Sequence, residues 1–197
     1  MTKQTISFAL LLLVGSFGPF ANGASAQAFG VNMGDSVSNY SAEKLNDGIY
    51  RIAVPQPNSE FESYVATATA ETGICKIAGL GKDHENDSYG NSVRTAYKSI
   101  QQALSQRYGN ALKEDFLLSG SIWNEPDEFG WSLYKKERKL ASFWDDEEGS
   151  DLPPSVQAIV LAAKSVEPST TYLQLYYEFS NYGKCKEIID EKDNAGL

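Results

Sequence analysis

β-Prone segments recur along the chain, and the clearest of them alternates apolar and polar residues with a period of two. In segment 171–179, Leu173, Leu175, Tyr177 and Phe179 share one face, which we expect to pack in the core. Segment 156–166 fits a strand or a buried helix, and we favour a strand because a short turn leads directly into 171–179. The full set of predicted strands is 50–54, 61–68, 74–80, 140–144, 156–166 and 171–179.

The apolar period changes to that of a helix in the middle of the chain. Val93, Ile100 and Leu104 recur at helical spacing, and Gly109 is a typical residue just beyond a helix C-terminus. Capping and stop residues predict three shorter helices, at 36–45, from 124 to the lysines at 135–136, and at 184–191.

These elements predict an α+β protein with an antiparallel sheet of about six strands and two to four helices. An alternative to a single domain is a division into two halves, 29–109 and 110–197, each a helix with a β-meander. The hairpins at 55–80 and 154–179 correspond in position, but few residues are identical between them, so an internal repeat is a hypothesis. A single α+β domain spanning 29–197 is the interpretation that we carry forward.

Residues 1–28 have the pattern of a secretory signal peptide. Lys3 provides the positive start, 6–14 is a short apolar core, and small residues place cleavage near Ala26 or Ala28. The apolar core is shorter than the roughly 20 residues that a membrane-spanning helix needs. We therefore expect a periplasmic or secreted protein, with no membrane span after cleavage.

The net charge of the chain favours some classes of binding partner over others. The 197 residues contain 17 basic and 26 acidic side chains, a formal net charge of −9. Removal of residues 1–28 takes away one lysine and no acid, which makes the charge −10. An acidic chain lacks the basic face that phosphate contacts require, so we expect no nucleic-acid binding. The same charge favours encounter with a basic protein partner.

The chain has two cysteines, Cys75 and Cys185, and both lie beyond the signal. In an oxidising compartment a cysteine pair of this kind predicts one disulfide bond. The alternative is two buried thiols. Within the strand around Cys75 we expect Cys75 and Ile77 on one face and Lys76 on the other.

One polar loop is a weak candidate for a metal site. Asp83, Glu85 and Asp87 offer hard oxygen ligands at alternating positions, the type of donor that calcium prefers. The loop departs from the EF-hand pattern, because Ser88 replaces the turn glycine and Arg94 the bidentate glutamate. A solvated loop is the simpler reading, and we predict no metal.

Catalytic motifs are not evident. His84 is the only histidine, and no GxSxG elbow supplies a nucleophilic serine. A carboxylate-dependent hydrolase would use Glu125, Asp127 and Glu128, which lie near Trp123 and Trp131 in the chain. We favour a simpler account, in which the acids cap a helix and the tryptophans fill the core.

Cofactor motifs are not evident either. Gly79 and Gly81 follow a strand, but the third glycine of a dinucleotide loop does not follow them. We predict no cofactor.

The outer face of segment 171–179 is the remaining candidate. Tyr172, Gln174 and Tyr176 combine tyrosine rings with polar side chains, a composition favoured on recognition surfaces. An ordinary solvent-facing sheet is the alternative. We expect an exported, non-enzymatic binding protein; the alternatives are a secreted hydrolase and a carrier of a divalent metal or small ligand.

Overall fold

A computed structural model describes residues 27–146 and 149–194. Its elements, in chain order, are β1 (Gln27–Ala28), β2 (Val31–Asn32), a 3₁₀ turn (Val37–Asn39), β3 (Ala42–Asn46), β4 (Ile49–Ile52), β5 (Phe61–Thr69), β6 (Gly73–Gly81), α1 (Asn91–Tyr108), β7 (Leu112–Leu117), a second 3₁₀ turn (Pro126–Glu128), α2 (Phe129–Tyr134), β8 (Arg138–Asp145), β9 (Val156–Glu167), β10 (Thr170–Phe179) and α3 (Tyr182–Asn194).

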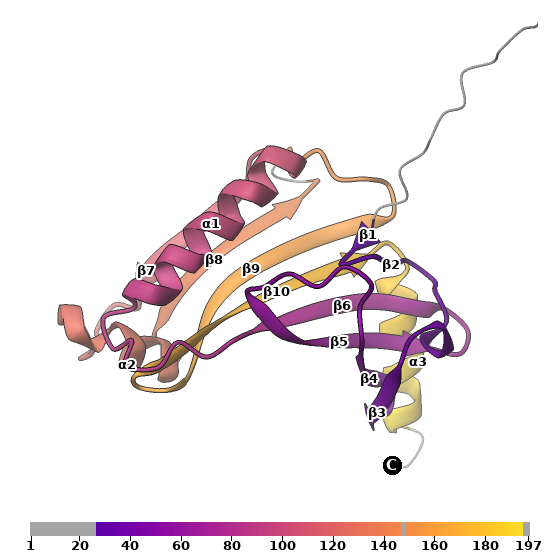
Figure 1. Ribbon diagram of the computed structural model, residues 1–197, viewed down its shortest axis with the longest axis horizontal. Helices are drawn as coiled ribbons and strands as arrows, with labels where there is room; N and C mark the ends of the chain where they lie inside the picture. The colour runs from indigo at the N-terminus through magenta and orange to yellow at the C-terminus, as the bar shows by residue number, and fades with distance from the viewer. Residues whose placement is uncertain (1–26, 147–148, 195–197) are drawn as a thin grey trace, which may run out of the picture.

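One eight-stranded antiparallel sheet organises the fold (Figure 1). Its strand order is β3-β4-β5-β6-β10-β9-β8-β7, so each half of the chain contributes four consecutive strands, and the two meanders meet where β10 pairs with β6. The α+β class predicted from the sequence is confirmed. The strand count is higher than predicted, by the two strands that form the edges of the sheet, β3 and β7.

The prediction of a helix at 36–45 was wrong. Ser36 does cap a helical turn, but the turn is only the 3₁₀ segment Val37–Asn39, and the chain continues as β3. Every residue of β3 is exposed, so this edge strand carries no apolar alternation from which it could be recognised. β7 was not predicted either, because most of its residues are exposed and they show no apolar alternation.

α1 is the long helix that the sequence predicted, and it lies along one face of the sheet (Figure 1). Its buried side chains Val93, Tyr97, Leu104 and Tyr108 contribute to the main core, together with Leu173 and Phe179 of β10, among others. The Tyr97 hydroxyl is 2.6 Å from the Ser142 hydroxyl of β8, which links the helix to the strand beside the edge strand β7.

Aromatic side chains pack against one another where the first described residues contact the core. Phe29, in the turn between β1 and β2, makes edge-to-face contacts with Phe61, Tyr64 and Tyr177. Ala28 is 1% exposed. The predicted signal peptide lies outside the described residues except for Gln27 and Ala28, which form β1. Among the described helices, none is long and apolar enough to cross a membrane.

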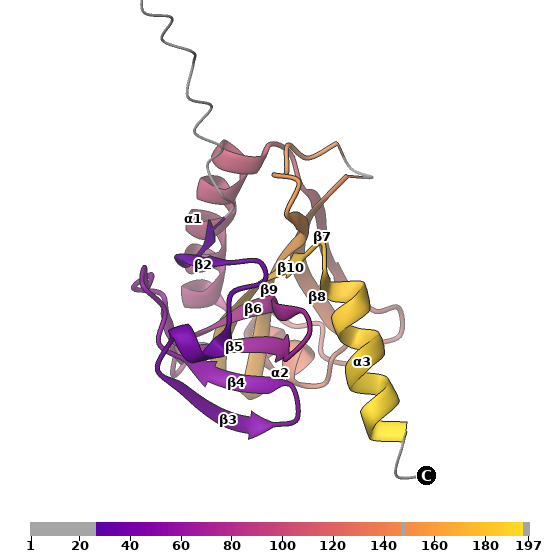
Figure 2. The ribbon, with the colours of Figure 1, turned by 90° about the vertical axis from the view of Figure 1, so that its right-hand side faces the viewer.

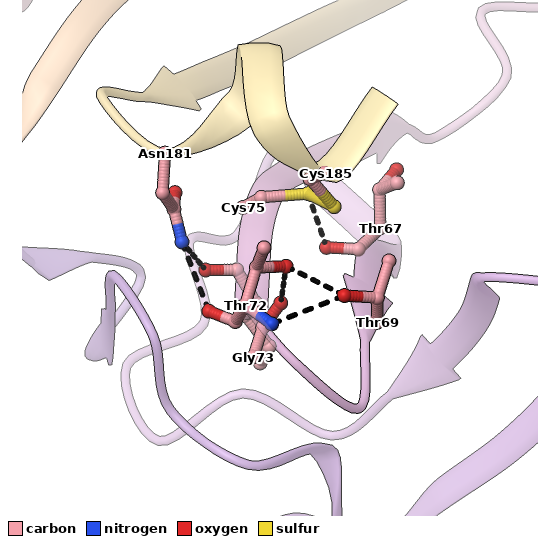
Figure 3. Close-up of a disulfide and its surroundings, with 8 residues drawn as sticks. Thr67, Thr69, Thr72, Gly73, Cys75, Asn181 and Cys185 are labelled. Atoms are coloured by element: carbon pink, nitrogen blue, oxygen red, sulfur yellow. Dashed lines mark hydrogen bonds between the residues drawn. A yellow bond between two sulfur atoms is a disulfide. The ribbon is translucent and has the colours of Figure 1, made fainter. Parts of the chain in front are cut away.

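The predicted disulfide between Cys75 and Cys185 is present, and it ties α3 to β6 (Figure 3). A register shift next to Thr67 leaves Cys75 as an extra residue in β6. The expectation that Cys75 and Lys76 lie on opposite faces was therefore wrong. Both residues reach α3, and the Lys76 ammonium lies 5.1 Å from the ring centre of Tyr182.

α3 lies across the sheet from α1, with strands of the sheet between them (Figure 2). The side-chain amide of Asn181, just before α3, donates to the backbone carbonyls of Thr72 and Ile74 (Figure 3). The helix is therefore held at its beginning by hydrogen bonds to the end of the β5–β6 turn and the start of β6, and by a covalent bond to β6.

Candidate functional site

The outer face of β10 carries the tyrosines that the sequence singled out. Leu173, Leu175, Tyr177 and Phe179 are buried towards α1, while Tyr172, Gln174, Tyr176 and Glu178 alternate with them and are partly exposed. The predicted division of this strand into a core face and an outer face agrees with the structure.

A groove opens beside this face because two neighbouring strands separate. β8 pairs with β7 along 138–143, and β9 pairs with β10 as far as Glu167. Between β8 and β9, however, pairing stops at Ala141 and Ala162. The short helix α2 packs against both diverging strands. The sheet thus splits at this end into two ribbons, and the groove lies at the split.

The groove has a volume of about 540 Å³, within the range typical of ligand pockets. Tyr172, Gln174 and Tyr176 contribute to one side of it. Its apolar lining comes from strands β7 to β9 and from α2: Phe116, Leu118, Leu133, Tyr134, Phe143 and Val160, among others. Phe116, Leu118 and Tyr134 are also among the most exposed large apolar side chains of the described residues.

Cations predominate among the charged groups of the groove. They are Lys136, Arg138, Lys139 and Lys164, with Glu137 as the single acid of the lining. Arg138 pairs with Asp115, and Lys139 with Glu114. Lys136 and Lys164 have no ion-pair partner among the residues that the structure describes. The local charge of the groove is therefore opposite in sign to the net charge of the chain.

Tyr176 is held in place from the side away from the groove. The Lys76 ammonium lies 4.0 Å from the centre of its ring and 2.8 Å from a carboxylate oxygen of Glu178. Burial raises the pKa of the hydroxyls of both Tyr172 and Tyr176 above 10.0, so each phenol keeps its proton at neutral pH. Both hydroxyls are thus available as hydrogen-bond donors as well as acceptors.

The structure does not assemble the weak metal candidates. Asp87 is buried, and its carboxylate accepts hydrogen bonds from the backbone of Ser92 and Val93 and from the hydroxyl of Thr171. Asp83 and Glu85 are exposed in the loop before it. No group of residues suited to a metal ion is found among the described part of the chain.

His84 belongs to the loop that was expected to be solvated, but it is partly buried. Its Nε2 lies 3.0 Å from a carboxylate oxygen of Glu60, and its backbone pairs with that of Thr171. These contacts join the loop after β6 to the start of β10. They give His84 a structural role.

Two of the three acids considered for a hydrolase belong to a helix cap, and the third, Asp127, is exposed beside them. Glu125 and Glu128 form a reciprocal capping box around the 3₁₀ turn that precedes α2, as the simpler reading of the sequence expected. The tryptophans differ from that reading. Trp123 and Trp131 stack on each other at 4.7 Å and remain partly exposed, so they do not fill the core.

Sequence reasoning identified one side of the groove and missed the other. Phe116 belongs to an edge strand without apolar alternation, and Lys136 and Lys164 look like ordinary surface lysines. Lys136 has a positive φ of 60°, a conformation that closes the turn between α2 and β8 but leaves no signature in the sequence. Nothing local in the sequence reports that β8 and β9 diverge.

No family model, no curated protein and no solved structure matches the chain.

Proposed function

We propose that this chain is an exported, non-enzymatic binding protein that recognises a protein partner through the groove beside Tyr172, Gln174 and Tyr176. The observation that carries the proposal is the groove itself, where apolar walls and amphipathic tyrosines adjoin two lysines that have no ion-pair partner among the described residues. Recognition surfaces combine these features: aromatic anchors with a few polar groups around them.

Export is supported by the signal-like start of the chain and by the disulfide bond. A binding role rather than turnover is supported by what the candidate catalytic groups do. Glu125 and Glu128 cap a turn, and His84 joins a loop to β10.

The charge of the partner follows from two separate features. The net charge of −9, or −10 without the signal, favours long-range attraction of a partner with a basic surface. Inside the groove, Lys136 and Lys164 favour a contact segment that places a carboxylate or polar group beside an apolar side chain. We propose a basic protein that presents such a segment.

The test is a pull-down from envelope and extracellular extracts with the purified protein, eluted by rising salt. We expect one stoichiometric partner that the variant Tyr172→Ser/Tyr176→Ser fails to retain. Tyr89→Ser is the matched control, because Tyr89 is an exposed tyrosine that does not line the groove. Equal recovery by all three proteins would reject the groove as the site. Chemical conversion of a captured molecule would favour the hydrolase alternative instead.

A further inference from the structure

The edge strand β7 leaves one side of the sheet unpaired, and apolar side chains gather there. β7 is the last strand in the sheet order, so its outer edge has no strand partner among the described residues. Leu112 and Phe116 are 41% and 44% exposed, and Leu118 and Ile122 follow directly in the chain with similar or greater exposure. An edge strand with exposed apolar residues is a template for pairing with another strand.

We propose that β7 pairs with β7 of a second copy of this chain, which forms a symmetric dimer with a continuous sheet across the interface. Two identical strands meet about a twofold axis in an antiparallel arrangement. The outward amide groups of a strand belong to alternate residues, so residues of the same parity must face one another. The axis therefore passes through a residue of β7 rather than between two.

Axes through Glu114 and Asp115 each pair five of the six residues of β7, an axis through Lys113 pairs three, and the residues that face one another distinguish these registers. An axis through Lys113 sets Lys113 against itself and Leu112 against Glu114. An axis through Asp115 sets Asp115 against itself and Glu114 against Phe116. Both registers combine a like-charge pair with apolar residues opposite acids, and both arrangements are unfavourable.

An axis through Glu114 gives complementary pairs. Lys113 of each copy then lies opposite Asp115 of the other, and Leu112 lies opposite Phe116, twice each by symmetry. Glu114 faces its own copy, but its charge is already paired with Lys139 of β8, just as Asp115 is paired with Arg138. The pairs beside the axis therefore decide between these two registers, and only the axis through Glu114 keeps the acids away from Phe116. This register is the one that the geometry supports.

The dimer has a consequence for the groove. In an antiparallel pair, side chains opposite each other point to the same face of the sheet. Phe116 lines the groove, so the pairing of Leu112 with Phe116 places the two grooves on one face of the joined sheet. The dimer does not depend on the proposed binding function, but it would present two sites in the same direction.

The test uses charge reversal in the purified protein with its disulfide intact. Lys113→Asp alone creates two Asp–Asp oppositions across the axis, and Asp115→Lys alone creates two Lys–Lys oppositions. An equimolar mixture of the two variants restores opposite charges at both positions, and so does the double variant Lys113→Asp/Asp115→Lys. Lys44→Asp makes the same charge change on β3, at the other edge of the sheet, and is the matched control.

Sedimentation velocity over a concentration series measures the dissociation constant of each protein. We expect a dimer for the wild type and for Lys44→Asp, and dissociation constants at least about tenfold higher for each single charge-reversal variant. The mixture and the double variant should recover the wild-type value to within about threefold. A wild type that stays monomeric to millimolar concentration would overturn the proposal. So would single variants that dimerise like the wild type, or a mixture that fails to recover.

Discussion

The buried carboxylate of Asp87 and the hydroxyl of Thr171 are 2.7 Å apart, although 84 residues separate them in the chain. The same carboxylate accepts from the backbone N–H groups of Ser92 and Val93, in the first turn of α1. Gly90, the N-cap residue of α1, makes no side-chain cap of its own. Asp87 therefore caps the helix from outside it and attaches that end to β10.

Replacement of Asp87 by alanine leaves two N–H groups and one hydroxyl without their acceptor. We expect Asp87→Ala to lower the free energy of unfolding by about 2–4 kcal/mol. Asp83→Ala, an exposed change in the same loop, should stay within about 0.5 kcal/mol of the wild type. Urea unfolding followed by circular dichroism measures both. Equal midpoints for the two variants would show that the cap contributes nothing.

The disulfide bond should account for a large part of the stability. Cys75 and Cys185 enclose a separation of 110 residues, for which the chain-entropy model gives about 4–5 kcal/mol. We expect reduction to lower the melting temperature of the wild type and to leave that of Cys75→Ala/Cys185→Ala unchanged. Intact mass after alkylation without reductant is the independent check, and the appearance of two labelled thiols would contradict the bond.

We expect buried tyrosines to make the protein less stable at alkaline pH. Burial, followed by the hydrogen bond to Asp35, raises the pKa of Tyr40 to about 12, and burial raises the pKa of Tyr177 still further. In the unfolded chain these phenols ionise near pH 10.0, whereas in the folded chain they keep their protons. Their contribution is therefore complete below pH 10 and is lost as the pH rises through the folded-state values.

We expect the free energy of unfolding to fall steadily above pH 10, by about 1.4 kcal/mol per pH unit for a group as buried as Tyr177. Tyr177→Phe removes this ionisation, so its stability should decline less steeply over the same range. Denaturant unfolding at several pH values measures both slopes. Parallel slopes for wild type and variant would refute the assignment to Tyr177.

The fold narrows the predicted position of signal cleavage. Ala28 is almost completely buried, and β1 pairs with β2 through Gln27 opposite Asn32 and Ala28 opposite Val31. Cleavage after Ala28 would remove β1, whereas cleavage after Ala26 preserves it. We expect exported protein to begin at Gln27, as measured by the intact mass. A mature chain that begins at Phe29 would show that the pairing of β1 is dispensable.

How far the sequence predicts this fold depends on where each strand lies in the sheet. Interior strands such as β10 carry a strong alternation, because one face packs on α1 while the other remains partly exposed. The edge strands β3 and β7 are exposed on most positions, so burial imposes no pattern on them, and the sequence predicted a helix for one and nothing for the other. The Cys75–Cys185 bond could be predicted from the expected oxidising compartment and from the presence of two cysteines in the chain.

The groove was only half predictable. Tyr172 and Tyr176 lie on an alternating strand, and their outward direction follows from the buried residues between them. The opposite wall depends on where β8 and β9 stop pairing, and α2 packs against both of these strands. Such a divergence is a property of three elements together, and a single segment of sequence does not encode it.

The bond between Cys75 and Cys185 also closes a covalent ring. The ring contains α1, α2, β7, β8, β9 and β10. Its most exposed large apolar side chain is Ile122, in the loop after β7. A protease that cuts this loop opens the ring without releasing a fragment, because the two pieces stay joined through sulfur. Separation of the two pieces then requires reduction of the disulfide as well as loss of the pairing of β6 with β10 and of β7 with β8.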